Sequence, residues 1–296
     1  MATVQDLKRR IRSIRNTRKI TKAMELVASA RLRRAEARIE AMRPFADRMT
    51  ELMTGTAKAS TSLQGLALLQ RREVKKAAII PLTGDRGLAG AFNAQVLRHA
   101  FALEQQLRGD GVEVHWLVAG KKGRSTLGFR RYEIDQSWIG FSDRPSYHDA
   151  QAIARKAAEL YETGEVDRVV IVYNQFVSAL VQRVVERDLL PIPEEALAHD
   201  EAEAREEALL GDFIYEPEPE EILQRLLPVY VETELYRALL ESAASEQGAR
   251  MTAMRNASGN AADLISSLTL DMNRARQAEI TQEILEVVAG ADALTG

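Results

Sequence analysis

The stretch ASARLRRAEARIEAMRPFADRMTELM, residues 28–53, repeats apolar residues at alternating intervals of four and three. This interval gives the narrow apolar seam by which one α-helix coils around another. No glycine or proline other than Pro44 occurs before Gly55. We therefore predict one long helix over residues 3–58, bent at Pro44, where the proline ring removes a backbone hydrogen bond. The apolar seam positions are Val4, Leu7, Ile11, Ile14, Ala28, Leu32, Ala35, Ile39, Met42, Ala46, Met49 and Met53.

The seam changes character between Arg18 and Glu25, where the positions that continue its spacing are polar. The apolar side chains of this stretch, Ile20, Met24 and Val27, lie on a neighbouring line of the helix surface. Two explanations fit this pattern. Either the stretch faces something other than the partner helix, or the register of the coiled coil shifts there.

The C-terminal residues 220–289 predict the partner helix, kinked near its start by Pro228, weakly interrupted at Gly259 and Asn260, and ended by Gly290. Neither helix can bury its whole length in the domain between them, because a helix rises only 1.5 Å per residue. We expect the two helices to cover their seams against each other as an antiparallel coiled coil. The second seam is Leu227, Val231, Leu235, Met251, Met254, Ala257, Ala261, Leu264, Leu268, Met272 and Ala275.

The middle of the chain alternates strand-like and helix-like segments, which predicts a Rossmann-like α/β domain with a mainly parallel sheet. The last strand follows its predecessor too closely for a helical crossover, so these two should pair antiparallel. The predicted strands span residues 77–82, 112–118, 166–173 and 177–185, and the predicted helices span residues 91–108 and 147–162.

These patterns divide the chain into four parts. The predicted parts are an N-terminal coiled-coil helix at 1–60, the α/β domain at 74–192, an acidic linker at 193–219 and a C-terminal coiled-coil helix at 220–290. The linker contains several prolines and acidic residues, and we expect it to be exposed, with a short helix near Glu201–Leu210.

Composition argues against several classes of protein. Cysteine is absent, so there is no disulfide framework and no thiolate ligand or nucleophile. The four histidines are scattered without paired ligand spacing, so we expect no metal. No apolar run approaches the roughly 20 residues of a membrane span. No Ser/His/Asp set or paired carboxylates can be argued either, so we expect an elongated, non-enzymatic interaction protein without a cofactor.

Charge is distributed unevenly, since residues 1–43 are rich in Lys and Arg and residues 186–221 are rich in Asp and Glu. A basic arm can bind nucleic acid, but no aromatic residue occurs before Phe45 to stack on bases, so nucleic acid is not an expected partner. The narrow apolar stripe lacks the Trp and Phe of a membrane-surface helix, and the heptad pattern is too long for a transit peptide. The remaining interpretation of the basic arm is a charged face of a coiled coil, which is either exposed to water or turns inside an acidic collar.

The segment PLTGDRGLAGAFN, residues 81–93, lies between the first predicted strand and a helix, where nucleotide-binding folds hold phosphate. Its GxxGxxG spacing matches neither the GxxxxGK[ST] loop nor the GxGxxG fingerprint. We favour a tight turn with close packing over nucleotide binding, and we interpret Gly120–Ser125 in the same way. Residues 272–284 are polar on all faces, which fits a lone helix in water and a helix surrounded by partners equally well.

Four segments closely resemble the ATP synthase gamma family, in the family's order and over nearly the whole chain. They are IRNTRKITKAMELVA at 14–28, LTGDRGLAGAFN at 82–93, SEQGARMTAM at 245–254 and NRARQAEITQEI at 273–284. The resemblance implies a rotor inside a hexamer of alternating alpha and beta subunits. Its foot, with epsilon, would be attached to a membrane ring of c subunits that proton flow turns.

The resemblance also implies which residues couple rotation to the beta subunits. Lys19 and Met24 match positions near the beta lever region. Positions implicated in coupling, or in a catch with beta loops, are matched by Arg250, Arg276, Gln277, Thr281 and Glu283. The final turns, around Ile284–Ala289, would sit in an apolar bearing.

Two features of the chain bear on the organism and the compartment in which we expect it. The chain lacks the cysteine-bearing insertion typical of chloroplast forms and begins directly at the family's N-terminus, which favours a bacterial origin. The resemblance therefore implies a peripheral protein at the cytoplasmic face of the cell membrane, held there through the c-ring. The acidic stretch 194–210 is longer than expected for the family.

Overall fold

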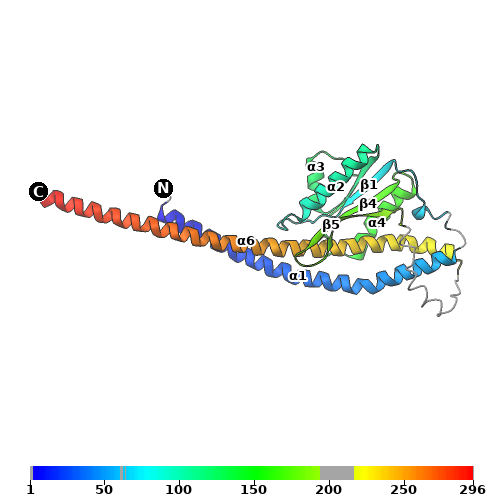
Figure 1. Cartoon of the computed structure of the whole chain (residues 1–296), viewed down its shortest axis with the longest axis horizontal. Helices are drawn as coiled ribbons and strands as arrows, with labels where there is room; N and C mark the ends of the chain where they lie inside the picture. Colours follow the sequence, from blue (N-terminus) through cyan, green and yellow to red (C-terminus); the bar gives the residue numbers. More distant parts are fainter. Residues whose placement is uncertain (1–2, 61–62, 64, 194–216, 296) are drawn as a thin grey trace. The chain divides into compact units, whose positions relative to one another are not determined.

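Figure 1 shows the chain as a computed structural model, with two long terminal helices and a five-stranded sheet. The structure describes residues 3–60, 63, 65–193 and 217–295, and only the backbone of residues 291–295. The acidic stretch 194–210, with the short helix predicted near Glu201–Leu210, lies outside the described residues. Within the described part, no helix is both long enough and apolar enough to cross a membrane.

The chain divides into two compact units. One, which we call the two-helix unit, comprises residues 1–28 and 250–296, and the other, the sheet unit, comprises residues 29–249. Both boundaries fall inside helices, since α1 runs from Val4 to Ala59 and α6 from Pro219 to Thr295. The four-part division drawn from the sequence stays a prediction.

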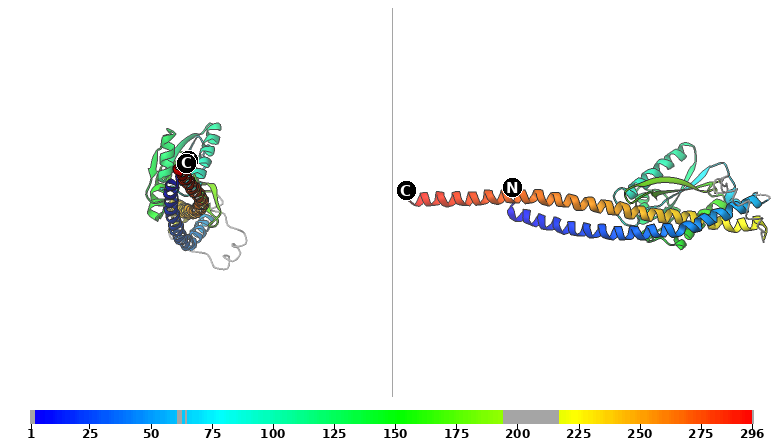
Figure 2. Two further views of the ribbon diagram at one scale, coloured as in Figure 1. Left: turned by 90° about the vertical axis from the view of Figure 1, so that its left-hand side faces the viewer. Right: turned by 60° about the horizontal axis from the view of Figure 1, so that its bottom comes forward.

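α6 is longer than the sequence predicts, and both terminal helices continue through their prolines. α1 passes through Pro44 and α6 passes through Pro228 without ending. The predicted stop at Gly290 is wrong, because α6 continues to Thr295. A single glycine lowers helix propensity by only about 1 kcal/mol, which the surrounding residues outweigh. In the two-helix unit, α6 also runs on beyond the N-terminal end of α1 (Figure 1, Figure 2).

The seam of α1 in the two-helix unit keeps its spacing through the polar stretch, although Arg18 at one seam position is exposed. Thr21 and Glu25 occupy seam positions and are only 8% and 7% exposed. Ile20 and Val27, on the neighbouring line, are 60% and 53% exposed. The seam spacing therefore continues through Thr21 and Glu25 without a shift of register. The first of the two explanations holds for Ile20 and Val27, which face away from the partner helix, but not for Thr21 and Glu25, which face it.

In the two-helix unit, the seam of α6 differs from the predicted one at a single position. Met251, Met254 and Ala261 are buried, but Leu264 is 49% exposed, so its assignment to the seam is wrong. The buried line passes through the neighbouring Ile265, which is half-buried. A straight α-helix has about 3.6 residues per turn, whereas a strict heptad needs 3.5. The buried line therefore moves to the next residue after a few turns, here from Leu264 to Ile265.

The sheet has the strand order β3-β2-β1-β4-β5. The four pairings formed by β1 to β5 are parallel except for the antiparallel pair of β4 and β5, so the predicted mainly parallel sheet with its antiparallel last pair is confirmed. The strands are β1 (Lys76–Pro81), β2 (Glu113–Ala119), β3 (Gln136–Trp138), β4 (Arg168–Phe176) and β5 (Gln182–Leu190). The helices are η1 (Ala67–Leu69), α2 (Phe92–Gly109), α3 (Lys121–Phe129) and α4 (Tyr147–Glu162).

Each face of the sheet has its own apolar core. One core joins the sheet to α2 and α3, through residues such as Val96, Leu103 and Leu127. The other joins the opposite face to α4, to the first part of α6 and, through Met49 and Met53, to α1 (Figure 1). α6 contributes to it Leu223, Leu227, Val231, Leu235 and Leu239.

The expectation that the helices cover their seams only against each other is therefore wrong for this part of α6. Leu227, Val231 and Leu235 are buried in the core of the sheet. A sheet face left to α4 alone would expose apolar side chains, and α6 removes them from water. In the sheet unit the two terminal helices still run antiparallel, since Ser60, just after α1, donates a hydrogen bond of 2.8 Å to Glu220 at the start of α6.

Candidate functional site

The loop after β1 stands at the carboxyl edge of the sheet, where Rossmann-like folds place phosphate. In this chain the carboxylate of Asp85 accepts the backbone hydrogen bonds that a bound phosphate would accept in such folds. It accepts hydrogen bonds from the backbone amides of Lys121 at 2.9 Å, Gly140 at 2.9 Å and Ser142 at 3.0 Å. Burial raises the pKa of Asp85, but these amide hydrogen bonds outweigh it and hold the pKa below its ordinary value. The first backbone amides of α3 therefore have acceptors within the chain: Lys121 donates to Asp85, Lys122 to Gly84 and Gly123 to Thr83.

Little space remains beside this loop. The cavity bordered by Thr83, Ser142 and Glu246 has a volume of about 10 Å³, whereas small-molecule pockets span roughly 300–1,000 Å³. A methyl group on Gly84 would lie 2.8 Å from the carboxylate of Glu246. The glycines therefore allow α6 to pack closely, as the tight-turn interpretation predicts, and this crevice has no room for a nucleotide.

The segment Ser245–Gly248 of α6 docks the helix onto the α/β domain, by which we mean β1 to β5 with α2 to α4. Ser245 donates a hydrogen bond of 2.9 Å to the carbonyl oxygen of Asn174 in β4. At Gly248 a methyl group would lie 3.0 Å from the carbonyl oxygen of Ala179, in the turn between β4 and β5. Only glycine lets the turn approach so closely.

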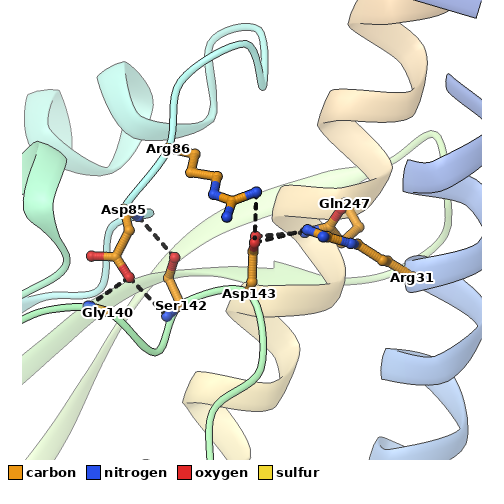
Figure 3. A network of polar contacts seen from close by, with 7 residues as sticks. All are labelled: Arg31, Asp85, Arg86, Gly140, Ser142, Asp143 and Gln247. Atoms are coloured by element: carbon orange, nitrogen blue, oxygen red, sulfur yellow. Dashed lines mark hydrogen bonds and ion pairs between the residues drawn. The ribbon is translucent and has the colours of Figure 1, made fainter. Parts of the chain in front are cut away.

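Asp143, in the loop between β3 and α4, joins three further elements (Figure 3). Its Oδ2 atom lies 2.8 Å from Nη1 of Arg31 in α1 and 3.5 Å from Nη1 of Arg86 in the loop after β1. Its Oδ1 atom accepts a hydrogen bond of 3.2 Å from Nε2 of Gln247 in α6. One carboxylate thus connects both terminal helices to the α/β domain. Nothing in the sequence pattern singles out Asp143, because its partners are distant along the chain.

Glu25 is the centre of a polar cluster in the seam of the two-helix unit. Nζ of Lys22 lies 3.0 Å and Nε of Arg255 lies 3.1 Å from its carboxylate oxygens. The hydrogen bond from Lys22, followed by the one from Arg255, holds the pKa of Glu25 below its ordinary value. A polar group at one seam position can fix the register of a coiled coil, which an apolar residue would leave less defined.

The surface around this cluster is cationic and partly apolar. Lys19 is exposed, Met24 is half-buried and Leu26 is 63% exposed. A groove between α1 and α6 has Glu25 as its acidic residue and is lined by the cations Lys8, Arg12, Arg15, Arg18, Lys19, Lys22 and Arg255. Of the predicted site residues, Lys19 lines this groove and Met24 lies between its lining residues in sequence.

The other predicted site residues fall into two groups. Arg276, Gln277, Thr281 and Glu283 are all exposed on the last part of α6, where Thr281 donates a hydrogen bond of 2.9 Å back to the carbonyl oxygen of Gln277. Arg250 differs, because it is only 6% exposed. The structure therefore does not bring the seven predicted residues together into one site.

Comparisons with known proteins decide the family. A model of the ATP synthase family matches residues 3–294. The ATP synthase gamma chain of Rubrobacter xylanophilus is 48% identical over 295 residues, covering 99% of each chain. This chain belongs to the ATP synthase gamma-chain family. The gamma chain of Moorella thermoacetica is 46% identical, over 99% of this chain and 100% of its own length.

A solved structure agrees with this assignment. The chain is similar to one in the structure of the central stalk and c-ring of the Tetrahymena thermophila mitochondrial ATP synthase. That similarity has a TM-score of 0.59 at 27% identity and covers 81% of this chain and 99% of the other. The gamma chain described here is the rotor subunit of the central stalk and is not catalytic by itself.

The motifs that carry the gamma-family resemblance have two different structural roles. Asp85 and the segment Ser245–Gly248 form hydrogen bonds and close contacts inside the sheet unit. Lys19 and Gln277, by contrast, lie on segments of the two-helix unit that are exposed to solvent. The first kind of motif builds the gamma chain, and the second kind is available to other subunits.

The Glu25 cluster predicts a pH-dependent contribution to the stability of this gamma chain. Because the pKa of Glu25 is lowered on folding, its contribution is present above the unfolded value of about 4.3 and is lost as pH falls through the folded pKa. Glu25→Gln should therefore unfold at a lower temperature than the wild type near neutral pH, and the gap should shrink in acid. Thermal melts followed by circular dichroism at about pH 7 and about pH 3 test this. An equal gap at both values would show that the carboxylate charge plays no part.

Proposed function

We propose that the outward line of α1 around residues 18–27 is the surface through which this rotor acts on the alpha and beta subunits. One observation carries the proposal: the polar residues Thr21 and Glu25 occupy the seam, while Ile20 and Val27 face away from the partner helix. A helix that served only its coiled coil would place its side chains the other way round. Clustered exposed apolar side chains mark a protein contact surface.

Electrostatics supports the same surface. The cations of the groove beside this line include Arg12, Arg15 and Lys19. An acidic collar of the alpha–beta hexamer would attract this face and favour certain angles of the shaft. Because attraction between exposed charges is screened by salt, it can bias the angle without locking it. Lys19 and Met24 are the residues of this face that we assign to coupling.

The last turns of α6 form a second contact region. Ile284, Leu285, Val287 and Val288 are 52% to 71% exposed. An apolar bearing in the hexamer would remove these side chains from water. We assign Arg276, Gln277, Thr281 and Glu283 to contacts with beta loops just before this region, and Arg250, which is buried, to a supporting role within the shaft.

The remaining partners follow from the family. We propose that the α/β domain, together with epsilon, forms the foot attached to the c-ring, and that the gamma chain meets the membrane only through this ring. The central stalk of the Tetrahymena thermophila enzyme is described together with its c-ring, which supports this arrangement. In a bacterium this would place the chain at the cytoplasmic face of the cell membrane.

The mechanism is a difference in contacts among the three beta subunits. At each angle the asymmetric shaft presents the outward line of α1 to one beta subunit and other faces to the remaining two. A contact that favours one conformation of beta shifts its population by the difference in contact free energy. A shift from 1:99 to 99:1 needs about 5.5 kcal/mol, and rotation driven by proton flow supplies it to each site in turn.

Reconstitution with alpha and beta subunits tests the assignment of the outward line. The wild-type chain should restore ATPase activity to the alpha–beta mixture. Ile20→Ser should require about tenfold more chain for half-maximal activity, because removing a central apolar contact costs at least ~1–2 kcal/mol. The matched control is Leu52→Ser, since Leu52 is an equally exposed apolar residue of α1, in the sheet unit. Equal effects of the two substitutions would refute the assignment.

A further inference from the structure

We propose that Asp143 is a positioning residue of the rotor, the link that makes α1 turn together with the α/β domain. The proposal rests on the rotor function above and adds the residue through which torque reaches the first helix. A rotor subunit whose domain can twist against one of its helices loses part of each step as elastic motion.

The geometry places Asp143 at a junction of three parts of the sheet unit (Figure 3). Its carboxylate contacts Arg31 from α1, Gln247 from α6 and Arg86 from the loop after β1. The two terminal helices and the α/β domain thus share one anchoring group. A charged acceptor holding two guanidinium groups makes stronger and more directional contacts than neutral hydrogen bonds do.

The loop that carries Asp143 is itself held firmly, so that it can transmit force. Its neighbour Ser142 donates its backbone amide to Asp85 at 3.0 Å, and the hydroxyl of Ser142 accepts the amide of Asp85 at 2.8 Å. Gly140 donates to the same carboxylate at 2.9 Å. Asp85 therefore fixes the loop to the carboxyl edge of the sheet, and Asp143 extends from this fixed point toward α1.

α1 depends on this link more than α6 does. α6 is anchored by a row of side chains in the core of the sheet, from Leu223 to Leu239. α1 contributes only Met49 and Met53 to the same core. Between the buried residues Leu32 and Met49, the seam of α1 is only partly buried at Ile39, Met42 and Ala46. Cavities of 310 Å³ and 550 Å³ border Met42. Close apolar packing resists twisting, and there is less of it along this part of α1.

The experiment measures torsional stiffness in the assembled complex. The alpha–beta hexamer is immobilised, a probe is attached to the α/β domain, and the angular variance of the probe is recorded while the rotor is stalled. Asp143→Asn should increase this variance about twofold, because the charged connection between the domain and α1 is weakened. Arg31→Gln removes the same link from the other side and should give a similar increase. The double variant should not exceed the effect of Asp143→Asn, since the contact that Arg31→Gln removes is already weakened in Asp143→Asn.

The matched control is Asp188→Asn, which removes a short ion pair with Arg168 inside the α/β domain, at 2.6 Å. Both acid-to-amide substitutions should lower the unfolding temperature by at most about 2–4 °C, because these pairs are partly exposed. Only Asp143→Asn should widen the angular distribution. An unchanged variance with Asp143→Asn, or an equal increase with Asp188→Asn, would overturn the proposal. ATPase activity restored by every variant shows that the rotor function itself is intact, so the two claims can fail separately.

Discussion

Gly120→Ala is expected to destabilise the chain more than any other single substitution considered, by at least several kcal/mol. Gly120 has a φ of +97°, and a methyl group there would lie 2.0 Å from the carbonyl oxygen of Thr83. The backbone cannot move aside easily, because Gly120 donates its amide to Trp138 at 2.8 Å and Thr83 donates its amide to Ala119 at 2.9 Å. These bonds tie the ends of three neighbouring strands together.

The magnitude follows from two separate penalties. The unfavourable backbone conformation costs about 1–3 kcal/mol, and overpacking against an immobile backbone costs at least about 1–3 kcal/mol more. Their sum is a large part of a total stability of about 5–15 kcal/mol. Urea unfolding of the purified chain measures the loss. The control is Gly128→Ala in the same helix α3, where a methyl group meets nothing within 4 Å and should stabilise the helix by up to about 1 kcal/mol. Similar stability of the two variants would contradict this account of the turn.

Met24→Lys is expected to uncouple ATP hydrolysis from proton transport while leaving the chain folded. Met24 is half-buried beside the cationic groove, so a lysine at this position can extend its ammonium group toward solvent. Against an acidic collar, the new charge forms an ion pair that must be broken at every turn. A close interfacial pair of about 1.5 kcal/mol would slow its release about tenfold.

The measurement is the ratio of protons transported to ATP hydrolysed by the reconstituted enzyme. We expect this ratio to fall in Met24→Lys, with a stability change within about 0.5 kcal/mol. Val181→Lys is the control, because Val181 is 48% exposed in the turn between β4 and β5, far from residue 24 in sequence. Equal losses of hydrolysis and transport, with no change in their ratio, would count against the proposed contact.

The sequence predicted the long helices and most of the sheet, because their patterns are local. The heptad spacing located α1 within one residue at each end. The alternation of strands and helices placed β1, β2, β4, α2 and α4. The last strand was displaced, since β5 spans Gln182–Leu190 rather than 177–185. The apolar residues Val177 and Val181 that suggested the earlier start belong to the exposed turn.

Elements with weak local patterns were not predicted. β3 has only three residues, two of them polar, and it exists because β2 offers it a free edge. α3 contains Gly123 and Gly128, which disfavour a helix, and Asp85 from another loop caps its start. Whether the polar stretch from Arg18 to Glu25 shifts the register also depended on a distant residue, Arg255, which supplies the second partner of Glu25.

The candidate site shows the same limit. The outward apolar line could be recognised from the heptad interruption, but its exposure required the partner helix to be placed. The partners of Asp143 include Arg31, Arg86 and Gln247, which are separated widely along the chain, and no spacing rule connects them. Arg250 was grouped with the exposed coupling residues on the basis of the family resemblance, whereas the structure buries it.

We expect this chain to turn as a rotor inside a ring of alpha and beta subunits. The most direct measurement attaches a probe to the α/β domain of the chain in an immobilised complex with alpha and beta, and follows the angle of the probe by single-molecule microscopy as ATP is added. We expect rotation in one direction, in three steps per turn, that stops when ATP is removed. A probe that stays at a fixed angle while the same complex hydrolyses ATP would contradict it.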